Sequence, residues 1–178
     1  MAFGTGGFLH PEEIIKQLNI QADSEVADFG CGAGYFSLPL AKMVHQGKVY
    51  SLDILDTALE SVRSRAKLKG LFNIETKRCN LEKERGSGLE DESMDLVLLA
   101  NILFQSSNKK DIIKEAVRVL KKDGCLALID WKPNQPMGPP EDMIIPLEEI
   151  KGVVEEQGLK EEKELPIDKY HWGVVFIK

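Results

Sequence analysis

Residues 28–34 read Asp28-Phe29-Gly30-Cys31-Gly32-Ala33-Gly34 and complete a short apolar segment that begins at Glu25. This order predicts a strand that ends in a glycine turn and is followed by a helix. Gly30 would let the chain leave the strand sharply, Gly32 would let backbone approach a ligand, and Gly34 would let the helix pack closely on the sheet. The first N–H groups of that helix would be free to bind the ligand.

The spacing of the glycines distinguishes between two kinds of ligand. Dinucleotide-binding turns have the pattern GxGxxG, whereas this turn is GxGxG and has Tyr35 where the last glycine would stand. A tyrosine there would obstruct a pyrophosphate, and Asp28 fits poorly beside phosphate but well near a positive ammonium and sulfonium. Asp53 ends the next predicted strand, where a carboxylate can accept the hydroxyl hydrogens of a ribose. The glycines alone also fit a purely structural turn, but together with Asp53 they favour an adenosine ligand.

Segments typical of strands and helices alternate on both sides of this turn. Helices are expected to begin at His10 and to cover about residues 34–45, 56–69 with Asp56 as N-cap, 108–122 with Asn108 as cap, and 147–157. Strands are expected at residues 25–29, 47–52, 73–78, 94–100, 125–131, 159–165 and 170–177, with a loop at 82–92. Too few residues join the last two strands for a helical crossover, so these strands should be antiparallel. The predicted fold is α/β: one domain over residues 1–178, with a doubly wound, Rossmann-like, mostly parallel sheet of seven strands and an antiparallel strand near one edge.

Composition limits the classes of protein that the chain can belong to. A formal net charge of −6 disfavours a nucleic-acid partner, because such partners favour basic surfaces. The chain shows neither a signal peptide nor an apolar run of the ~20 residues that a membrane helix needs. The cysteines Cys31, Cys79 and Cys125 are widely spaced, which is typical of free thiols in a cytoplasmic protein. The histidines are equally scattered, so no metal site is expected.

Four segments resemble motifs of the class I S-adenosylmethionine-dependent methyltransferases. They are residues 26–34 around the glycine turn, Val49-Tyr50-Ser51-Leu52-Asp53, Asp95-Leu96-Val97-Leu98-Leu99-Ala100-Asn101, and residues 118–124. The resemblance covers nearly the whole chain and looks closest to the small-molecule branch that includes the ubiquinone and menaquinone biosynthesis methyltransferases. It implies methyl transfer as the activity and S-adenosyl-L-methionine as the cofactor.

The resemblance also implies roles for single residues. Gly30, Gly32 and Gly34 would flank the methionine part of the cofactor, Asp28 would help to place its ammonium group, Asp53 would bind the ribose and Ile54 would cover one face of the adenine. Asn80 stands where the family often carries an acid for the adenine amino group, and Ala100 and Asn101 would lie beside the methionine and the methyl group. The cofactor site implied in this way comprises Asp28, Gly30, Cys31, Gly32, Gly34, Asp53, Ile54, Asn80, Leu81, Ala100 and Asn101.

The acceptor side of the site is much less defined by the sequence. A general base is needed only for a weakly nucleophilic acceptor, and no residue stands out as one. The candidates near strand ends are Asn101, Gln105, Asp130, Lys132 and His171. His171 is expected in an edge strand rather than in a catalytic pair, and Trp131 and Trp172 are expected in the core. The proline-rich residues 133–140 and the N-terminal glycines Gly4, Gly6 and Gly7 could form flaps over the site.

These observations favour an enzyme that acts on a small molecule. Two alternatives remain open: a methyltransferase that acts on protein or RNA, and a protein that binds S-adenosylmethionine without catalysis. A nicotinamide oxidoreductase is disfavoured by Tyr35. The sequence does not define the oligomeric state, although an exposed edge of the last strand pair would permit a dimer.

Overall fold

The computed structural model describes residues 9–178, so the predicted flap at Gly4, Gly6 and Gly7 lies outside the described residues. The strands are β1 (Glu25–Phe29), β2 (Lys48–Asp53), β3 (Ile74–Arg78), β4 (Met94–Ala100), β5 (Leu120–Trp131), β6 (Lys160–Glu164) and β7 (His171–Ile177). The helices are α1 (Pro11–Ile15), α2 (Ser37–Met43), α3 (Asp56–Leu68), α4 (Lys109–Val119) and α5 (Leu147–Glu156), with short 3-10 turns η1 (Leu103–Gln105) and η2 (Glu141–Met143).

The strands form one sheet in the order β3-β2-β1-β4-β5-β7-β6. Strands β1 to β5 are parallel, and β7 runs antiparallel to both of its neighbours, β5 and β6. This is the predicted doubly wound sheet with a reversed strand next to the edge. The chain first builds outward from β1 to β2 and β3, then returns to place β4 on the other side of β1. A ligand site is therefore expected at the carboxyl ends of β1, β2 and β4, where the strand order reverses.

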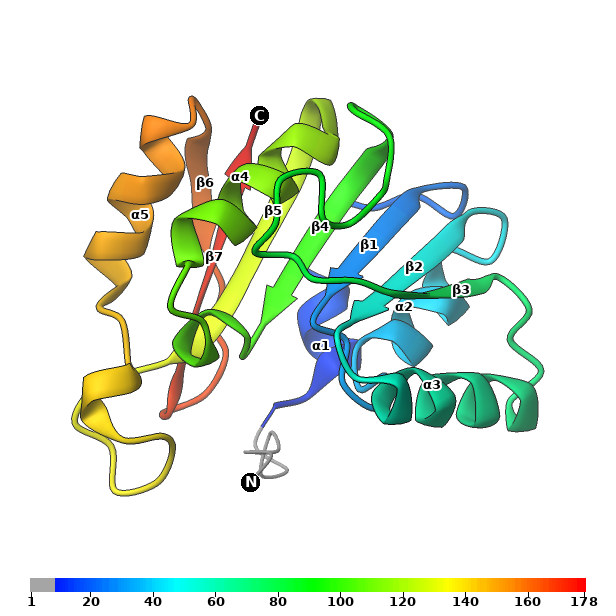
Figure 1. Cartoon of the computed structure of the whole chain (residues 1–178), viewed down its shortest axis with the longest axis horizontal. Coiled ribbons are helices and arrows are strands. Elements are labelled where there is room, and N and C mark those ends of the chain that lie inside the picture. Colours follow the sequence, from blue (N-terminus) through cyan, green and yellow to red (C-terminus); the bar gives the residue numbers. More distant parts are fainter. Residues whose placement is uncertain (1–8) are drawn as a thin grey trace.

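Helices cover both faces of the sheet (Figure 1), with α4 and α5 on one face and α1 and α2 on the other. Strand β4 shows why its sequence is apolar without alternation. Its Val97 and Leu99 belong to the core under α4 and α5, whereas Leu96 and Leu98 belong to the core under α1 and α2. All four side chains are almost fully buried, which is the pattern of a parallel strand covered on both faces.

The predicted loop between β3 and β4 covers the sheet in place of a helix, as its course in Figure 1 shows. Leu81 and Leu89 from this loop enter the core beside α4. The loop is held by Glu115 of α4, whose Oε1 accepts hydrogen bonds from the backbone N–H (2.9 Å) and the hydroxyl (2.5 Å) of buried Ser87. Arg118 of the same helix pairs with Glu115 and with Asp91 of the loop.

The starts of two helices and the capping of a third differ from the predictions. Helix α2 begins at Ser37 rather than near residue 34, because Gly34 has a φ of +81°, outside the helical region. Asp56 is the first residue of α3 and does not cap it; its carboxylate pairs with Arg78 at 2.8 Å instead. Asn108 makes no side-chain capping bond to α4.

Helix α4 ends at Val119, before the predicted residue 122, and β5 begins at Leu120. The side chain of the C-terminal Lys178 donates to the carbonyls of Val117 (2.9 Å) and Leu120 (2.7 Å), which satisfies groups at the end of the helix. Pairing between β4 and β5 then jumps from Leu120 to Cys125. The regular part of β5 therefore starts at the predicted position.

Candidate ligand-binding site

The glycine turn is fixed to strand β2 and packed from two sides. The N–H groups of Gly30 and Cys31 both donate to the carbonyl of Leu52, at 2.8 and 2.9 Å. A Cβ on Gly30 would lie 2.4 Å from Ile102, and one on Gly34 would lie 3.0 Å from Val62 of α3. Gly34 therefore permits close packing against α3, not against the sheet as predicted.

Gly32 differs from the other two glycines because the space in front of it is open. A Cβ there would meet nothing within 4 Å, although φ is +50°. Its N–H donates to Oδ2 of Asp53 at 2.9 Å, while the N–H of Leu55 donates to Oδ1 at 2.9 Å. The glycine turn and the acid 21 residues later are thus in direct contact. Each carboxylate oxygen has a further lone pair for a ligand hydroxyl.

The apolar residue predicted to cover an adenine is accessible. Ile54 follows Asp53 directly and is 53% exposed. An exposed isoleucine beside a strand-end carboxylate provides a surface on which a flat ring can lie. Asn80 lies just after β3, the strand next to β2. Its Oδ1 accepts the N–H of Glu82 at 2.9 Å in a local turn. That oxygen retains one lone pair for a ligand.

Two predicted site residues can reach a ligand only through their backbone. The Cys31 side chain is buried against Leu59 and Val62 of α3, and burial raises the pKa of its thiol well above the ordinary value. Leu81 is also buried, in the core beside α4. Their assignment to the cofactor site remains a prediction.

Asp28 lies beneath the turn with its carboxyl group buried. Its Oδ2 accepts the hydroxyl of Ser37 at 2.5 Å, and the Ser37 hydroxyl accepts that of Ser51 at 2.8 Å. Burial raises the pKa of Asp28 to about 6 against the opposing effect of the Ser37 hydrogen bond, and the charge of Asp53 raises it further. Its predicted role toward an ammonium group stays a prediction.

Asn101 follows β4 in a strained conformation. Its φ is +55°, which is uncommon outside glycine. Its N–H donates to the carbonyl of Ile129 (2.8 Å) and its carbonyl accepts Nε2 of Gln105 (2.7 Å). The side-chain amide is buried, however, and neither Oδ1 nor Nδ2 has a hydrogen-bond partner. Because an unpaired buried polar group costs about 1–3 kcal/mol, this amide is a candidate for contact with a ligand.

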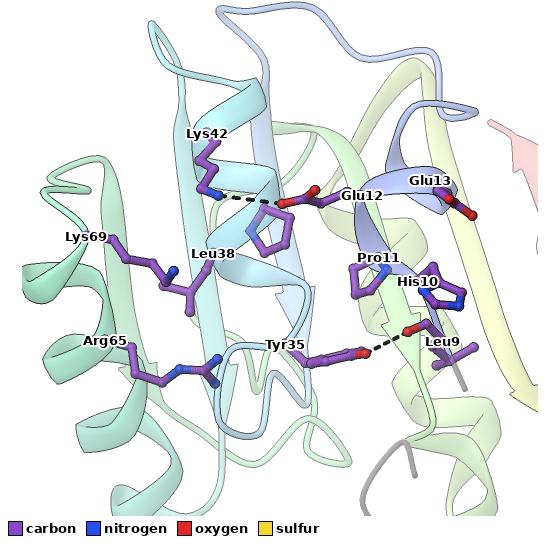
Figure 2. A pocket seen from close by; sticks show the side chains of 11 residues that line it. Leu9, His10, Pro11, Glu12, Glu13, Tyr35, Leu38, Lys42, Arg65 and Lys69 are labelled. Carbon is purple, nitrogen blue, oxygen red and sulfur yellow. Dashed lines mark hydrogen bonds and ion pairs between the residues drawn. The ribbon is translucent and has the colours of Figure 1, made fainter. Parts of the chain in front are cut away.

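The outer side of the turn faces an open groove of about 370 Å³ between α1, α2 and α3 (Figure 2). Tyr35 has a structural role in this groove. Its hydroxyl donates to the carbonyl of Leu9 at 2.6 Å and holds the segment before α1. Arg65 of α3 donates to the carbonyl of Ala33 at 2.6 Å. Tyr35 and Arg65 therefore hold the glycine turn from the side of this groove.

The remaining base candidates occupy the ends of β5 and β7. Asp130 is buried, and its carboxylate accepts the backbone N–H of Trp131 (2.8 Å) and of Phe104 (3.3 Å). Burial raises the pKa of Asp130 to about 7 in spite of these hydrogen bonds. Lys132 donates its ammonium to the carbonyl of Asp168 at 2.9 Å.

The prediction that His171 belongs to an edge strand is wrong, because β7 lies between β5 and β6. Its Nδ1 is 2.9 and 3.0 Å from the two carboxylate oxygens of Asp168. Trp131 and Trp172 are buried, as predicted. The spacing Asp168-x-x-His171 is visible in the sequence, but only the turn before β7 brings the two side chains together. Within residues 9–178, no cluster of three or more metal-ligating side chains is present.

The fold and the strand-end site define a class of proteins. A sheet of this order, with a glycine turn after β1 and an acid after β2, is the Rossmann-like fold of the class I S-adenosylmethionine-dependent methyltransferases. A family model described as a methyltransferase domain matches residues 20–164. The chain therefore belongs to the methyltransferase domain family.

Individual relatives agree with this assignment. The chain is 30% identical over 127 residues to a demethylmenaquinone methyltransferase of Listeria welshimeri. The matched residues cover 70% of this chain and 52% of that protein. It is 27% identical over 125 residues to the uncharacterized methyltransferase YcgJ of Bacillus subtilis, covering 70% of this chain and 47% of the relative. The chain thus spans about half the length of these curated relatives. A crystal structure of a SAM-dependent methyltransferase from Aquifex aeolicus superposes with a TM-score of 0.86 at 28% identity, over 96% of this chain and 90% of that one.

Proposed function

We propose that this chain transfers the methyl group of S-adenosyl-L-methionine to a small-molecule acceptor. The observation that carries the proposal is the contact between Asp53 and the N–H of Gly32. It places a carboxylate with free lone pairs at the mouth of a turn whose central glycine faces open space. A ribose needs the first feature, and a closely approaching ligand chain needs the second.

The residues present fit this cofactor. Asp53 would accept the ribose hydroxyls, Ile54 would lie against the adenine, and Asn80 would accept a hydrogen bond from the adenine amino group. The backbone beside Gly32 would border the methionine part. Asn101 supplies an unpaired amide with both a donor and an acceptor at the end of β4.

The protein's contribution to the reaction would be mainly orientation. When bound, the cofactor supplies a methyl group that its sulfonium has already activated. Asn101 and the turn would hold that group toward the end of β5, and burial of the acceptor would exclude water. Positioning of this kind provides effective molarities of ~10⁵ M or more.

Several observations support a small-molecule acceptor. The relatives include demethylmenaquinone methyltransferases, and the net charge of −6 disfavours a polyanion.

Cys31, Cys79 and Cys125 are all free in the described part of the chain, which supports a cytoplasmic location. The edge strand β6 has the charged sequence Lys160-Glu161-Glu162-Lys163-Glu164, which argues against a dimer formed by strand pairing.

Calorimetric titration with S-adenosylhomocysteine tests the proposal. The wild-type protein should bind it, and Asp53→Ala should weaken binding about 10- to 150-fold for each ribose hydrogen bond lost, because hydrogen bonds to a charged group contribute about 1.5–3 kcal/mol each. Asp53→Asn retains an acceptor oxygen for only one of the N–H groups of Gly32 and Leu55, so thermal melts of both variants are needed to separate ligand loss from a disordered turn. Asp56→Ala, an exposed carboxylate three residues away, is the matched control and should bind normally. A wild-type protein that binds no S-adenosylhomocysteine would exclude the proposed function.

A further inference from the structure

Five buried side-chain atoms in residues 9–178 are polar and have no hydrogen-bond partner. They are Oδ1 and Nδ2 of Asn101, Nε1 of Trp131, Nε2 of His171 and Nε1 of Trp172. All belong to neighbouring positions at one edge of the sheet: directly after β4, at the end of β5 and at the start of β7. Because β7 is antiparallel, its start lies at the same edge as the carboxyl ends of β4 and β5.

The concentration of unpaired groups at one edge calls for a ligand. Folded proteins leave few buried polar groups unpaired, and each exception needs an explanation. Here the exceptions lie beside the proposed cofactor site. They extend from β4 to β7, a distance of two strand spacings or about 10 Å. A bound acceptor between Asn101 and His171 would pair groups that the protein itself leaves open.

We infer that this edge is the acceptor subsite and that His171 removes a proton from a neutral aromatic hydroxyl compound bound there, with Asp168 as its positioning residue. The inference rests on the proposed methyl transfer and names its acceptor side. It adds a base to a reaction for which the sequence alone indicated none.

The hydrogen bonds of the His171–Asp168 pair determine which nitrogen of the imidazole is free. Nδ1 faces the Asp168 carboxylate, which also accepts the N–H groups of Tyr170 and His171 on Oδ1, both at 2.7 Å. A neutral imidazole held in this way donates its Nδ1 hydrogen to Asp168 and keeps a lone pair on Nε2. Nε2 is the atom without a partner.

Burial, more than the charged groups around it, keeps the His171 imidazole neutral. Burial lowers the pKa of His171 below its ordinary value, Asp168 acts in the opposite direction, and the ammonium of Lys132 lowers it further. Burial alone would raise the pKa of Asp168, but hydrogen bonds from His171 and from two backbone N–H groups outweigh it and lower that pKa. A neutral base beside an ionised carboxylate is the state in which His171 can accept a proton at pH 7.

The lining of the subsite indicates the kind of acceptor. The Trp131 ring lies 4.1 Å from the His171 ring, centroid to centroid, and clusters with Phe104 and Tyr170. The indole N–H of Trp131, which lies opposite His171 on the same face of the sheet, is unpaired, whereas the ammonium of Lys132 is engaged by the Asp168 carbonyl. Aromatic walls, a free donor and an engaged cation suit an uncharged ring with hydroxyl or carbonyl oxygens better than an anion.

A hollow and a cover lie next to this subsite. Asp168, His171 and Trp172 border a hollow of about 380 Å³, the size of a small-molecule pocket, whereas Asn101 and Trp131 do not line it. On the other side, the proline-rich segment after β5 lies over Trp131, where a Cβ on Gly138 would come within 2.8 Å of the indole. The predicted flap at residues 133–140 therefore covers part of this subsite.

The transfer step balances with these groups. The acceptor hydroxyl gives its proton to Nε2 of His171, and the oxygen uses an electron pair to bond the methyl carbon. The bond from methyl to sulfur breaks with its electron pair remaining on sulfur, which loses its positive charge. The proton then passes from His171 to water, and no oxidant or reductant is needed.

Nitrogen-detected NMR of histidine-labelled protein tests the inference without requiring turnover. His10 and His45 are exposed, so His10→Gln and His45→Gln assign their signals and leave those of His171. We expect His171 to be neutral at pH 7 with hydrogen on Nδ1, and to shift when hydroquinone is added to the complex with S-adenosylhomocysteine. The other tautomer, or signals that saturating hydroquinone does not move, would overturn the inference.

Two parallel measurements separate the proposed function from the proposed role of His171. They are kinetics with hydroquinone as acceptor and binding of S-adenosylhomocysteine. His171→Gln should bind S-adenosylhomocysteine within about twofold of wild type, lose the acidic limb of the pH profile and lower kcat about 10²- to 10⁴-fold. Asp168→Asn should lower kcat less and shift the same limb, and His45→Gln should change neither. Loss of S-adenosylhomocysteine binding in the wild type defeats the proposed function, whereas normal binding with an unchanged pH profile in His171→Gln defeats this inference alone.

Discussion

Gly32→Ala tests the glycine turn with a single added methyl group. Nothing in the protein lies within 4 Å of the position that this methyl would take, and the alanine keeps the N–H that donates to Asp53. The space that the methyl enters is the space assigned to the cofactor. The substitution should therefore damage ligand binding far more than folding.

The expected magnitudes follow from the local geometry. An alanine at a φ of +50° costs about 1–2 kcal/mol in folding free energy, which lowers Tm by about 2–8 °C for a chain of this size. A methyl group forced against a bound ligand costs about 1–3 kcal/mol more, so affinity for S-adenosylhomocysteine should fall about 5- to 150-fold.

Gly70→Ala is a matched control for the backbone strain. Gly70 has a φ of +65°, also has nothing within 4 Å of the position that an added methyl would take, and lies after α3. The Tm of Gly70→Ala should fall by a similar amount, but this variant should bind S-adenosylhomocysteine as the wild type does. Both quantities come from thermal melts and calorimetry of the same samples. If Gly32→Ala bound the ligand with wild-type affinity, the turn would not be the cradle of the cofactor.

Two further predictions concern neighbouring residues. Ile54→Ser should weaken S-adenosylhomocysteine binding about 3- to 10-fold, since ~50 Å² of apolar contact contributes roughly 25 cal/mol per Å²; Leu55→Ser, equally exposed, should not, and equal losses measured by calorimetry would contradict the adenine contact. Asp28 has its pKa raised from 3.8 to about 6, so its contribution to stability is complete below pH 3.8 and is lost as pH rises through 6, by about 3 kcal/mol in total. Asp28→Asn does not titrate, so urea unfolding should show it gaining stability relative to wild type between pH 4 and 7, whereas a difference independent of pH would refute the burial argument.

Much of the fold followed from local patterns in the sequence. Strands β1 and β4 have the predicted bounds, and the antiparallel pairing of β6 and β7 followed from the short connection between them. The boundaries that failed depend on distant residues. Helix α4 ends early at Val119 where the side chain of Lys178, the last residue of the chain, bonds its final carbonyls, and Asp56 pairs with Arg78 of β3 instead of capping α3.

The sequence by itself predicted the donor side of the site. Glycines and a strand-end acid are recognisable because the backbone of a tight turn and the end of a parallel strand restrict which residues fit, and such restrictions are local. Only the tertiary structure decided that Gly32 faces open space while Gly30 and Gly34 pack against Ile102 and Val62. It also decided that Asn101, Trp131 and His171, which are far apart in the chain, share one edge of the sheet with buried polar atoms left unpaired. Burial and hydrogen-bond pairing depend on every neighbour in space, and the pattern along the chain does not contain that information.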